Sequence, residues 1–368
     1  MNSKKLNNDE KILLSHGGGG KETSELINDV LFKELYGLNL NILNNDNAQN
    51  QIKLLEDAAI LNSPQKIAFT TDSFTVNPIF FKGGDIGKLS VAGTVNDLSV
   101  MGAKPLFLSL GLIIEEGFSA ADLRRVINSV AQEAKKSGVR VVTGDTKVVQ
   151  KGKADGIFIN TSGIGSVLYD NLSVYNITAG DAVIVSGDVG DHGAAIMSQR
   201  EGIEMDVEIE SDCASLWDMI ELVLKQGVSI SAIRDATRGG LAAVLNEWAM
   251  AAGVNIYIDE DNIPVNDSVK GFCELLGFEP YQLACEGRAV FAVKPEYVKK
   301  TLNILKSHPL GKNARIIGTV ENNNYYAGTG KGTGGGGFDF KGKVILKGIY
   351  GVNRLLDYPS GELLPRIC

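Results

Sequence analysis

The sequence predicts an α/β protein, of the α+β type, built from two domains and a flexible C-terminal tail. Short β-rich runs alternate with segments of helical periodicity in the first half of the chain. The same alternation starts again after a polar connector at residues 171–180. The last ten residues contain two prolines and a glycine, a composition that favours an extended tail over a helix.

The first half has well-marked helices and strands. Apolar residues recur every three positions from Leu89 to Met101, which predicts a helix over 87–101 that ends before Pro105. A second helix is predicted over 119–138, because Ser119 can cap its start and a glycine ends it. Strands are predicted over 66–71, 106–114, 139–142 and 156–167.

The second half is predicted to form a separate domain. We expect a helix over 240–252 and strands over 181–186, 255–259 and 289–293. The glycine-rich run 327–338 is expected to be a flexible loop. The predicted units are an N-terminal segment (1–45), an N-terminal domain (46–170), a C-terminal domain (171–350) and a tail (351–368).

Composition excludes several classes of function. The net charge is −8, from 36 basic and 44 acidic side chains, so the chain lacks the basic surface that nucleic acid or an anionic membrane requires. Neither a run of about 18 apolar residues nor a secretory signal is found. We therefore expect a cytoplasmic protein with no membrane or nucleic-acid partner.

Four cysteines and three histidines lack the spacing of a zinc site or a disulfide framework. Cys213, Cys273 and Cys285 are expected to be small buried residues. Cys368 is different because it ends the chain, where a thiol is normally exposed. By itself that position is compatible with a reactive thiol or with an accidental terminal cysteine.

Two glycine-containing segments could bind anions. The run from His16 to Lys21 resembles a phosphate loop but lacks its first glycine and its Ser/Thr, so it is either an anion-binding loop with Lys21 or a disordered segment. The run from Asp235 to Gly240 leads directly into a helix, whose first N–H groups and Arg238 suit phosphate. The alternative there is an ordinary helix start.

Four aspartates stand at predicted element ends or on a polar helix face, in similar Gly/Thr/Ser/Asn surroundings. A polyphosphate requires divalent cations, and these prefer carboxylate oxygens. Each aspartate alone could instead be a helix cap or a turn residue. They are Asp72, Asp85, Asp97 and Asp145.

Three motifs resemble the ATP-binding superfamily of aminoimidazole ribonucleotide synthetase and selenophosphate synthetase: residues 84–105, residues 142–147 and the segment before Leu241. Glu286-Gly287 adds to this resemblance. Within the superfamily, the terminal Pro-Arg-Ile-Cys and the Asp191-His-Gly run resemble the carbamoyl dehydratases of nickel–iron hydrogenase maturation. The resemblance extends from about residue 12 to Cys368.

The resemblance implies a reaction and its partners. A partner, HypF, would load a carbamoyl group onto Cys368. The chain would use ATP and Mg²⁺ to dehydrate that group to a thiocyanate, and the cyanide would pass to iron held by a HypC–HypD complex. Glu286 would accept the proton and Lys147 would stabilise developing charge. From the residues alone, Glu286 could also be a surface glutamate paired with Arg288. A homodimer formed through the N-terminal domains is also implied.

Carried over by motif, the remaining site residues bind the nucleotide and its metal. Metal ligands would be Asp72, Asp97, Asp145 and Asp235. Nucleotide-binding residues would be Lys21, Asp72, Asp85, Asp97, Asp145, Thr146, Asp235, Thr237, Arg238, Gly239 and Gly240. Two alternatives remain: another synthetase of the superfamily, or a non-catalytic adaptor switched by ATP. The absence of a cysteine from residues 11–21 disfavours selenophosphate synthetase.

Overall fold

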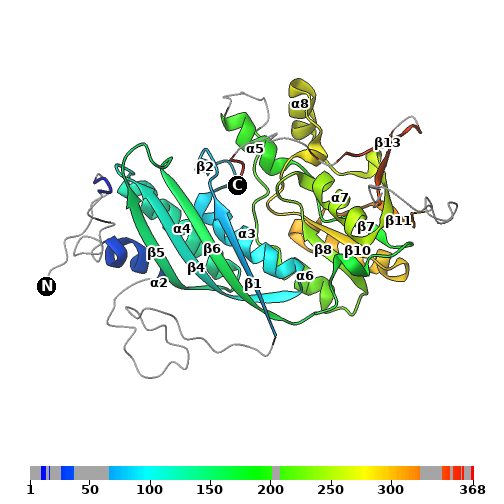
Figure 1. Cartoon of the computed structure of the whole chain (residues 1–368), viewed down its shortest axis with the longest axis horizontal. Helices are drawn as coiled ribbons and strands as arrows, with labels where there is room; N and C mark the ends of the chain where they lie inside the picture. The colour runs from blue at the N-terminus through cyan, green and yellow to red at the C-terminus, as the bar shows by residue number, and fades with distance from the viewer. Residues whose placement is uncertain are drawn as a thin grey trace, which may run out of the picture.

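Two β-sheets with helices packed against them lie side by side in the computed structural model (Figure 1). It describes residues 10–13, 16, 26–36, 66–200, 208–323, 342–348, 351–357, 359 and 366–368. The predicted α/β class is confirmed. Lys21, the loop 17–20 and the glycine-rich run 327–338 lie outside the described residues.

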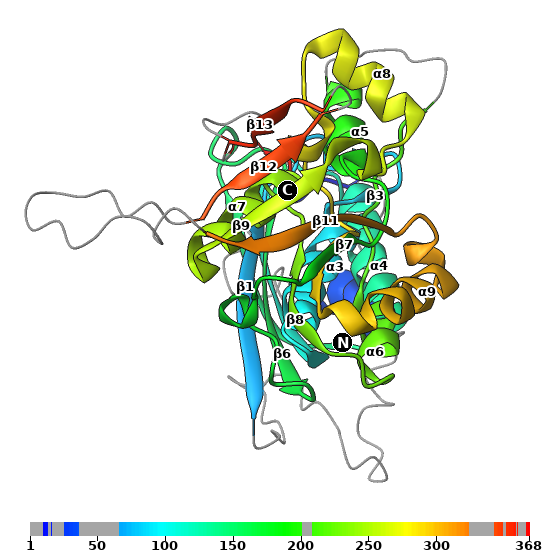
Figure 2. The ribbon, with the colours of Figure 1, turned by 90° about the vertical axis from the view of Figure 1, so that its right-hand side faces the viewer.

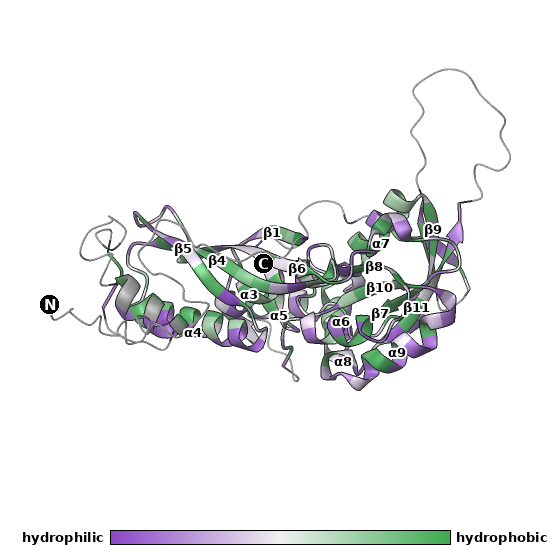
Figure 3. Cartoon of the chain, turned by 90° about the horizontal axis from the view of Figure 1, so that it is seen from below, coloured by the Kyte–Doolittle hydropathy of each residue, from purple (hydrophilic) through white to green (hydrophobic). Residues whose placement is uncertain are grey.

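The first sheet has four strands in the order β1-β6-β4-β5, with β4 and β5 parallel and the other pairs antiparallel. Helices α3 and α4 cover one face, and no other described helix covers the opposite face, which is called the open face below (Figure 3). The strands are β1 (Ile67–Phe74), β4 (Ala103–Glu115), β5 (Arg140–Val149) and β6 (Ile157–Val167). The helices are α3 (Ile86–Val100) and α4 (Ala120–Lys136).

The two helices differ in how they are buried. Helix α4 is amphipathic, and the Ser119 hydroxyl accepts a hydrogen bond from the Asp122 N–H at its start, as predicted. Helix α3 is buried on almost all sides because it packs against the first sheet, α4, and strand β8 and helix α6 of the second unit. Its small residues, such as Gly93 and Ala92, permit these close approaches. Helix α3 therefore joins the two sheets.

The second sheet has seven strands in the order β13-β12-β9-β11-β7-β10-β8 and is mixed (Figure 2). All its pairs are antiparallel except β12 with β9. Its central strands are buried on both faces: Val183 and Val290 pack with α7, whereas Ile184 and Phe291 pack with α6 and α9. The strands are β7 (Ala182–Val185), β8 (Ile230–Asp235), β9 (Val254–Asp259), β10 (Ala289–Val293), β11 (Arg315–Asn322), β12 (Val344–Lys347) and β13 (Asn353–Leu355).

The remaining elements were mostly not predicted. The described helices of the second unit are α5 (Asp191–Arg200), α6 (Trp217–Leu224), α7 (Gly240–Ala252), α8 (Asp267–Leu276) and α9 (Val298–Ser307). A short hairpin pairs β2 (Phe80–Phe81) with β3 (Gly84–Asp85), and a π-helical segment (Ile27–Phe32) precedes α2 (Lys33–Tyr36). Among the described residues, no helix is long and apolar enough to cross a membrane.

Two predicted boundaries were wrong in ways that matter for the site. Strand β5 continues to Val149 rather than ending at residue 142, so Asp145 and Lys147 lie inside a strand and not on a loop. Asp72 likewise lies within β1. Polar residues can continue these strands because pairing in the sheet provides hydrogen bonds for their backbone N–H and C=O groups. Their side chains alternate between the two faces of the sheet.

Candidate functional site

Four acidic side chains from both units form a cluster beside α3. Asp72 comes from β1, Asp97 from α3 and Asp235 from the end of β8, and Glu286 precedes β10. Burial, followed by the charge of Asp97, raises the pKa of Asp235 to about 7. Burial is also the main cause of the raised pKa values of Asp72 and Asp97, while the Thr70 hydroxyl donates to Asp97 at 2.8 Å. Burial and mutual repulsion therefore disfavour the ionised form of these carboxyl groups, and a nearby cation would stabilise that form.

Glu286 is the most deeply placed of these groups. Its side chain is buried, and within the described residues its Oε1 has no hydrogen-bond partner. Burial and then the charge of Asp235 raise the pKa of Glu286 well above its usual range. The alternative of a surface glutamate paired with Arg288 is wrong, because Arg288 pairs instead with Asp191 at 3.3 Å and Asp212 at 3.7 Å.

Asp212 fixes the backbone on which Glu286 stands. Its two carboxylate oxygens accept hydrogen bonds from the N–H groups of Glu286 at 2.9 Å and Gly287 at 3.2 Å. A Cβ at position 287 would collide with the Asp212 carbonyl oxygen, so only glycine fits there. Glycine at position 287 is therefore required by the packing, and the two hydrogen bonds to Asp212 hold the backbone of Glu286 in one place.

The chain end is docked into this site. The Cys368 thiol accepts a hydrogen bond from the Arg238 guanidinium at 3.3 Å. Its carbonyl oxygen accepts from the Thr75 N–H at 3.0 Å and the Thr75 hydroxyl at 3.2 Å. Burial, followed by the nearby Glu286 charge, raises the pKa of the Cys368 thiol to about 11. The expectation of an exposed terminal thiol is wrong for this arrangement.

Ile367 and Arg366 anchor the docked end. Ile367 is only 2% exposed, and its carbonyl oxygen lies 2.7 Å from Nε2 of His192. Arg366 has a φ of 53°, a left-handed conformation that is uncommon outside glycine. Its guanidinium donates to the Thr75 carbonyl at 2.8 Å and pairs with Asp155. These contacts hold the backbone of the tail, whereas the thiol packs against the first hydrophobic core and, among the described residues, has one hydrogen bond, from Arg238.

The start of α7 contributes Arg238 and two glycines to the site. Gly239 and Gly240 both have positive φ, and a Cβ on Gly240 would collide with the Leu283 carbonyl oxygen. Thr237 lies beside them, and its carbonyl oxygen accepts from the Gly240 N–H at 2.8 Å. The segment thus has the close backbone packing expected of an anion-binding helix start, with Arg238 directed to the thiol.

Other residues predicted for the site lie elsewhere in the protomer. Asp85 caps α3, because Oδ1 accepts from the N–H groups of Gly87 and Lys88 and Oδ2 accepts from the Ser129 hydroxyl. Asp145 and Lys147 pair with each other at 3.2 Å on the open face of β5, and Thr146 faces the covered side. Strand β5 is separated from β1 by two strands, about 14 Å at 4.8 Å per strand spacing.

The acidic cluster can hold a metal ion only together with other ligands. Among the residues that the structure describes, no three His, Cys, Asp or Glu side chains converge closely enough to hold a metal by themselves. Asp72, Asp97 and Asp235 nevertheless influence one another electrostatically. A Mg²⁺ ion there would need phosphate oxygens or water to complete its coordination, which is typical for magnesium.

Several residues that build the site were not identified as site residues from sequence. Asp212 has no motif signal, since its partners are two backbone N–H groups distant in sequence. Thr75 and Asp155 bind the tail from loops at strand ends. His192 belongs to the Asp191-His-Gly run noted in the sequence, but that run did not predict its contact with the chain end. It is buried between Ser211 and the tail.

Comparison with known proteins agrees with this geometry. The AIR synthase related protein N-terminal domain matches residues 55–167, and the C-terminal domain of the same description matches residues 178–331. The carbamoyl dehydratase HypE of Escherichia coli strain K12 is 43% identical over 358 residues, covering 97% of this chain and 99% of that protein. The chain belongs to the HypE family.

Solved structures of the HypE family match over most of the chain. HypE in complex with ATP has a TM-score of 0.86 at 39% identity, covering 97% of this chain and 99% of that one. A HypE–HypF complex has a TM-score of 0.73 at 49% identity, covering 83% of this chain and 93% of that one. Family membership accounts for the two-sheet fold.

Proposed function

We propose that this chain is an ATP-dependent carbamoyl dehydratase that acts on a carbamoyl group carried by its own Cys368. The observation that supports this most directly is the docked chain end, which brings Cys368 beside the buried carboxyl of Glu286, whose Oε1 has no hydrogen-bond partner among the described residues. The product is a thiocyanate on Cys368, which supplies the cyanide ligand for iron during hydrogenase maturation.

The reaction converts an S-carbamoyl group into an S-cyano group. The carbamoyl oxygen attacks the γ-phosphorus of ATP, ADP leaves, and one N–H proton is lost. The C–O bond then breaks, phosphate departs with the former carbamoyl oxygen, and the second N–H proton is lost as the C≡N bond forms. Phosphorylation is needed because the oxygen of an amide is a poor leaving group.

Glu286 is the candidate acceptor of an N–H proton. Its buried position beside other carboxyls raises its pKa, which makes the ionised form a stronger base than an exposed glutamate. Asp212 and Gly287 hold the backbone of Glu286, so the carboxyl is positioned before the tail docks. Its unpaired Oε1 leaves a lone pair available for this proton.

Arg238 is proposed to act on the carbamoyl oxygen. In the docked tail its guanidinium lies 3.3 Å from Sγ, one bond from the position of the carbamoyl carbon. A fixed cation there stabilises negative charge on the oxygen during its attack on phosphorus. From the sequence, Arg238 was predicted to bind phosphate. Binding phosphate and binding the carbamoyl oxygen are compatible roles, because that oxygen becomes bonded to the γ-phosphorus of ATP.

Loading and dehydration require different positions of the tail. A thiol with a pKa of about 11 is almost entirely protonated near neutral pH, so the docked Cys368 is a poor nucleophile. Acceptance of the carbamoyl group therefore takes place with the tail released. HypF is the proposed donor, supported by the solved HypE–HypF complex of a related chain.

ATP and Mg²⁺ are the proposed cosubstrate and cation. The related HypE was solved with ATP. Here the α7 start and Arg238 suit the phosphates, while Asp72, Asp97 and Asp235 suit the cation that accompanies them. When bound, Mg²⁺ would neutralise phosphate charge. Asp85, which caps α3, and Thr146 stay predictions as nucleotide-binding residues, and the predicted Lys21 lies outside the described residues.

A homodimer is proposed because the first sheet leaves an open face with exposed apolar side chains. Phe69 is 67% exposed, and its cross-strand neighbours on that face are Ile164 and then Phe107. Lys147 and Asp145 lie on the same face at the far edge of the sheet. Pairing two such faces would carry these residues toward the partner copy, so we propose that each copy supplies Lys147 to the other.

The remaining partners follow from the proposed product. A HypC–HypD complex is the proposed acceptor of the cyanide, and the cytoplasm is the proposed compartment. The domain limits at residues 45, 170 and 350 also stay proposals. The two family domains, which match 55–167 and 178–331, are compatible with them.

Intact-mass measurement of the full chain with HypF, carbamoyl phosphate and ATP tests the proposal. The wild type should gain a carbamoyl group on Cys368 and then lose one water. Cys368→Ser should gain nothing while binding ATP normally. Glu286→Gln should accept the carbamoyl group but retain its water. Normal water loss in Glu286→Gln would exclude Glu286 as the base, and a carbamoyl adduct on another residue would refute the carrier role of Cys368.

A further inference from the structure

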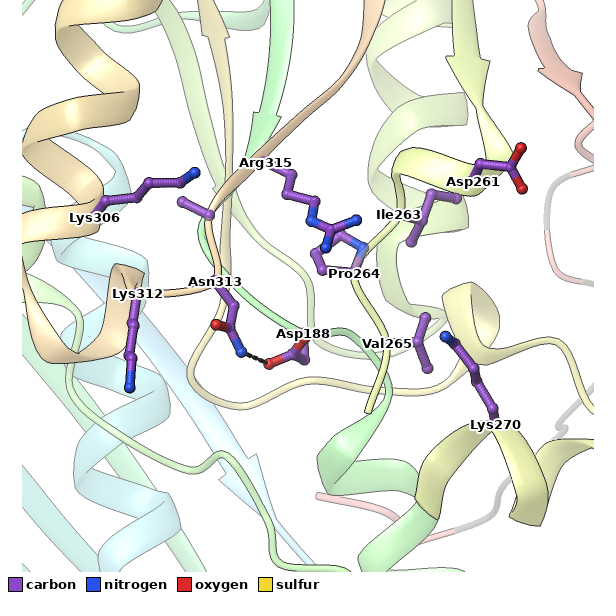
Figure 4. Close-up of a pocket in the computed structure, with 11 residues that line it drawn as sticks. Asp188, Asp261, Ile263, Pro264, Val265, Lys270, Lys306, Lys312, Asn313 and Arg315 are labelled. Carbon is purple, nitrogen blue, oxygen red and sulfur yellow. Dashed lines mark hydrogen bonds between the residues drawn. The ribbon is translucent and has the colours of Figure 1, made fainter. Parts of the chain in front are cut away.

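A second polar pocket lies in the C-terminal unit, away from the candidate site. Its volume is about 370 Å³, within the range of small-molecule pockets. It is bounded by the β7–α5 loop, the segment before α8, the end of α9 and the start of β11 (Figure 4). Ile263, Pro264 and Ala314 lie behind its lining and are buried, so most of the surface that the pocket presents is polar.

Four cationic side chains line this pocket. Lys270 comes from α8, Lys306 from the last turn of α9, Lys312 from the following loop and Arg315 from β11. Figure 4 shows Lys306, Arg315 and Lys270 approaching the same space from different elements. All four are exposed. Lys312 is directed away from this space (Figure 4), but the approach of the other three stands out in a chain whose net charge is −8.

Acidic neighbours do not neutralise this group. Asp188 and Asp261 are the two acidic residues of the lining, against four basic ones, so the lining keeps a net positive charge. The Asp188 carboxylate accepts a hydrogen bond from the Asn313 amide at 2.5 Å, and Asp261 is directed outward (Figure 4). Among the described residues, no ion pair involves Lys306, Lys312 or Arg315. Lys270 reaches only the fully exposed Asp267, at 3.6 Å. Lys306 lies in the last turn of α9, where the helix dipole favours a cation, but the other three cations have no such explanation.

The pocket is adjacent to the candidate site but separate from it. Asp188 lines the pocket with its side chain, while its backbone carbonyl accepts a hydrogen bond from Nε of Arg288 at 2.8 Å. Arg288 in turn pairs with Asp212, which holds Glu286. None of the residues assigned to the tail, the phosphates or the cation lines this pocket. A ligand can therefore occupy it while ATP is bound.

We propose that this pocket binds a small organic phosphate. Uncompensated cations repel one another, and an anion relieves that repulsion. The planar fork of Arg315, flanked by lysines, suits phosphate oxygens, and a pocket of about 370 Å³ has room for a small organic group attached to the phosphate. The proposal does not depend on the carbamoyl dehydratase function.

Titration calorimetry of the full chain with phenyl phosphate tests the site. The protein is first saturated with a non-hydrolysable ATP analogue so that the candidate site is filled. Measurements are made at about 0.15 M salt, where distant charges are largely screened. Phenyl phosphate should bind saturably at one site per chain, and phenol, its neutral counterpart, at least tenfold more weakly.

The matched variants separate a built site from general charge. Lys306→Glu with Arg315→Glu should weaken phenyl phosphate binding at least tenfold while leaving ATP-analogue affinity unchanged, which also shows that the variant folds. Lys299→Glu makes the same kind of charge change on α9, two turns away, and should bind as the wild type does. Equal binding of phenol, equal weakening by Lys299→Glu, or no saturable binding to the wild type would overturn the proposal.

Discussion

The imidazole of His192 joins helix α5 to the penultimate residue of the chain. Its Nε2 lies 2.7 Å from the Ile367 carbonyl, and its Nδ1 lies 2.7 Å from the Ser211 hydroxyl. Since a carbonyl can only accept, Nε2 carries the proton and Nδ1 accepts from Ser211 in the neutral ring. Burial lowers the pKa of His192, which keeps the ring neutral. A buried side chain thus recognises the tail through its backbone.

His192→Ala should release the chain end more often. Losing one buried hydrogen bond costs about 1 kcal/mol, or roughly a fivefold shift toward the undocked tail. The alkylation rate of Cys368, followed by mass spectrometry of the C-terminal peptide, should rise by a similar factor. His308→Ala removes a histidine that contacts the Leu310 N–H instead, and it should leave that rate unchanged. Equal rates in wild type and His192→Ala would show that His192 does not restrain the tail.

The carboxyl of Asp235 should make stability fall as the pH rises. Its pKa is raised to about 7 in the folded chain, so the folded state holds a proton that the unfolded state has lost. The stabilisation associated with that proton is complete below the unfolded pKa of about 4 and disappears as pH rises to about 7.

Asp235→Asn should therefore gain stability relative to the wild type as the pH is raised from 5 to 7.5, as measured by urea unfolding. The first pH lies about one unit above the lower limit of that window and the second about half a unit above its upper limit. The exposed Asp267→Asn provides the control, because an exposed carboxyl should not change the slope. If the difference in free energy of unfolding between the wild type and Asp235→Asn does not change with pH, the raised pKa of Asp235 is contradicted.

Gly287→Ala should destabilise the fold, because a methyl group there meets the Asp212 carbonyl oxygen. Overpacking of this kind costs about 1–3 kcal/mol in the free energy of unfolding. Gly271, inside α8, has no atoms within 4 Å of an added Cβ. Gly271→Ala should stabilise by about 0.5–1 kcal/mol, since alanine favours helix. Chemical denaturation of both variants measures the contrast, and equal stabilities would refute the close packing at Gly287.

Mixed dimers test whether Lys147 acts on the partner's site. Lys147→Ala and Glu286→Gln should each be inactive alone. If Lys147 serves the other copy, a mixed dimer contains one complete site, so an equal mixture should recover about a quarter of wild-type activity after subunit exchange. Phosphate release that depends on the carbamoylated tail measures this recovery. Mixing two preparations of the same variant provides the control, and no recovery would place Lys147 in its own protomer's site.

The α/β class, the helices α3, α4 and α7, and the family of the chain could all be predicted from the sequence. These rest on local signals, such as the cap at Ser119 and the glycines before α7, and on motifs of fixed spacing. The burial of Cys213, Cys273 and Cys285 was also predicted and is confirmed. Local chemistry is enough for such features.

Which residues share a site could not be predicted from the sequence and depends on the three-dimensional fold. Asp145 and Lys147 belong to a motif like those of Asp72 and Asp97, yet sheet order places them at the opposite edge. Asp212 and His192 act on backbone groups that are 74 and 175 positions away, and backbone groups leave no mark in the sequence. Long-range pairing of this kind depends on how strands are ordered and how the chain end docks, which no local pattern specifies.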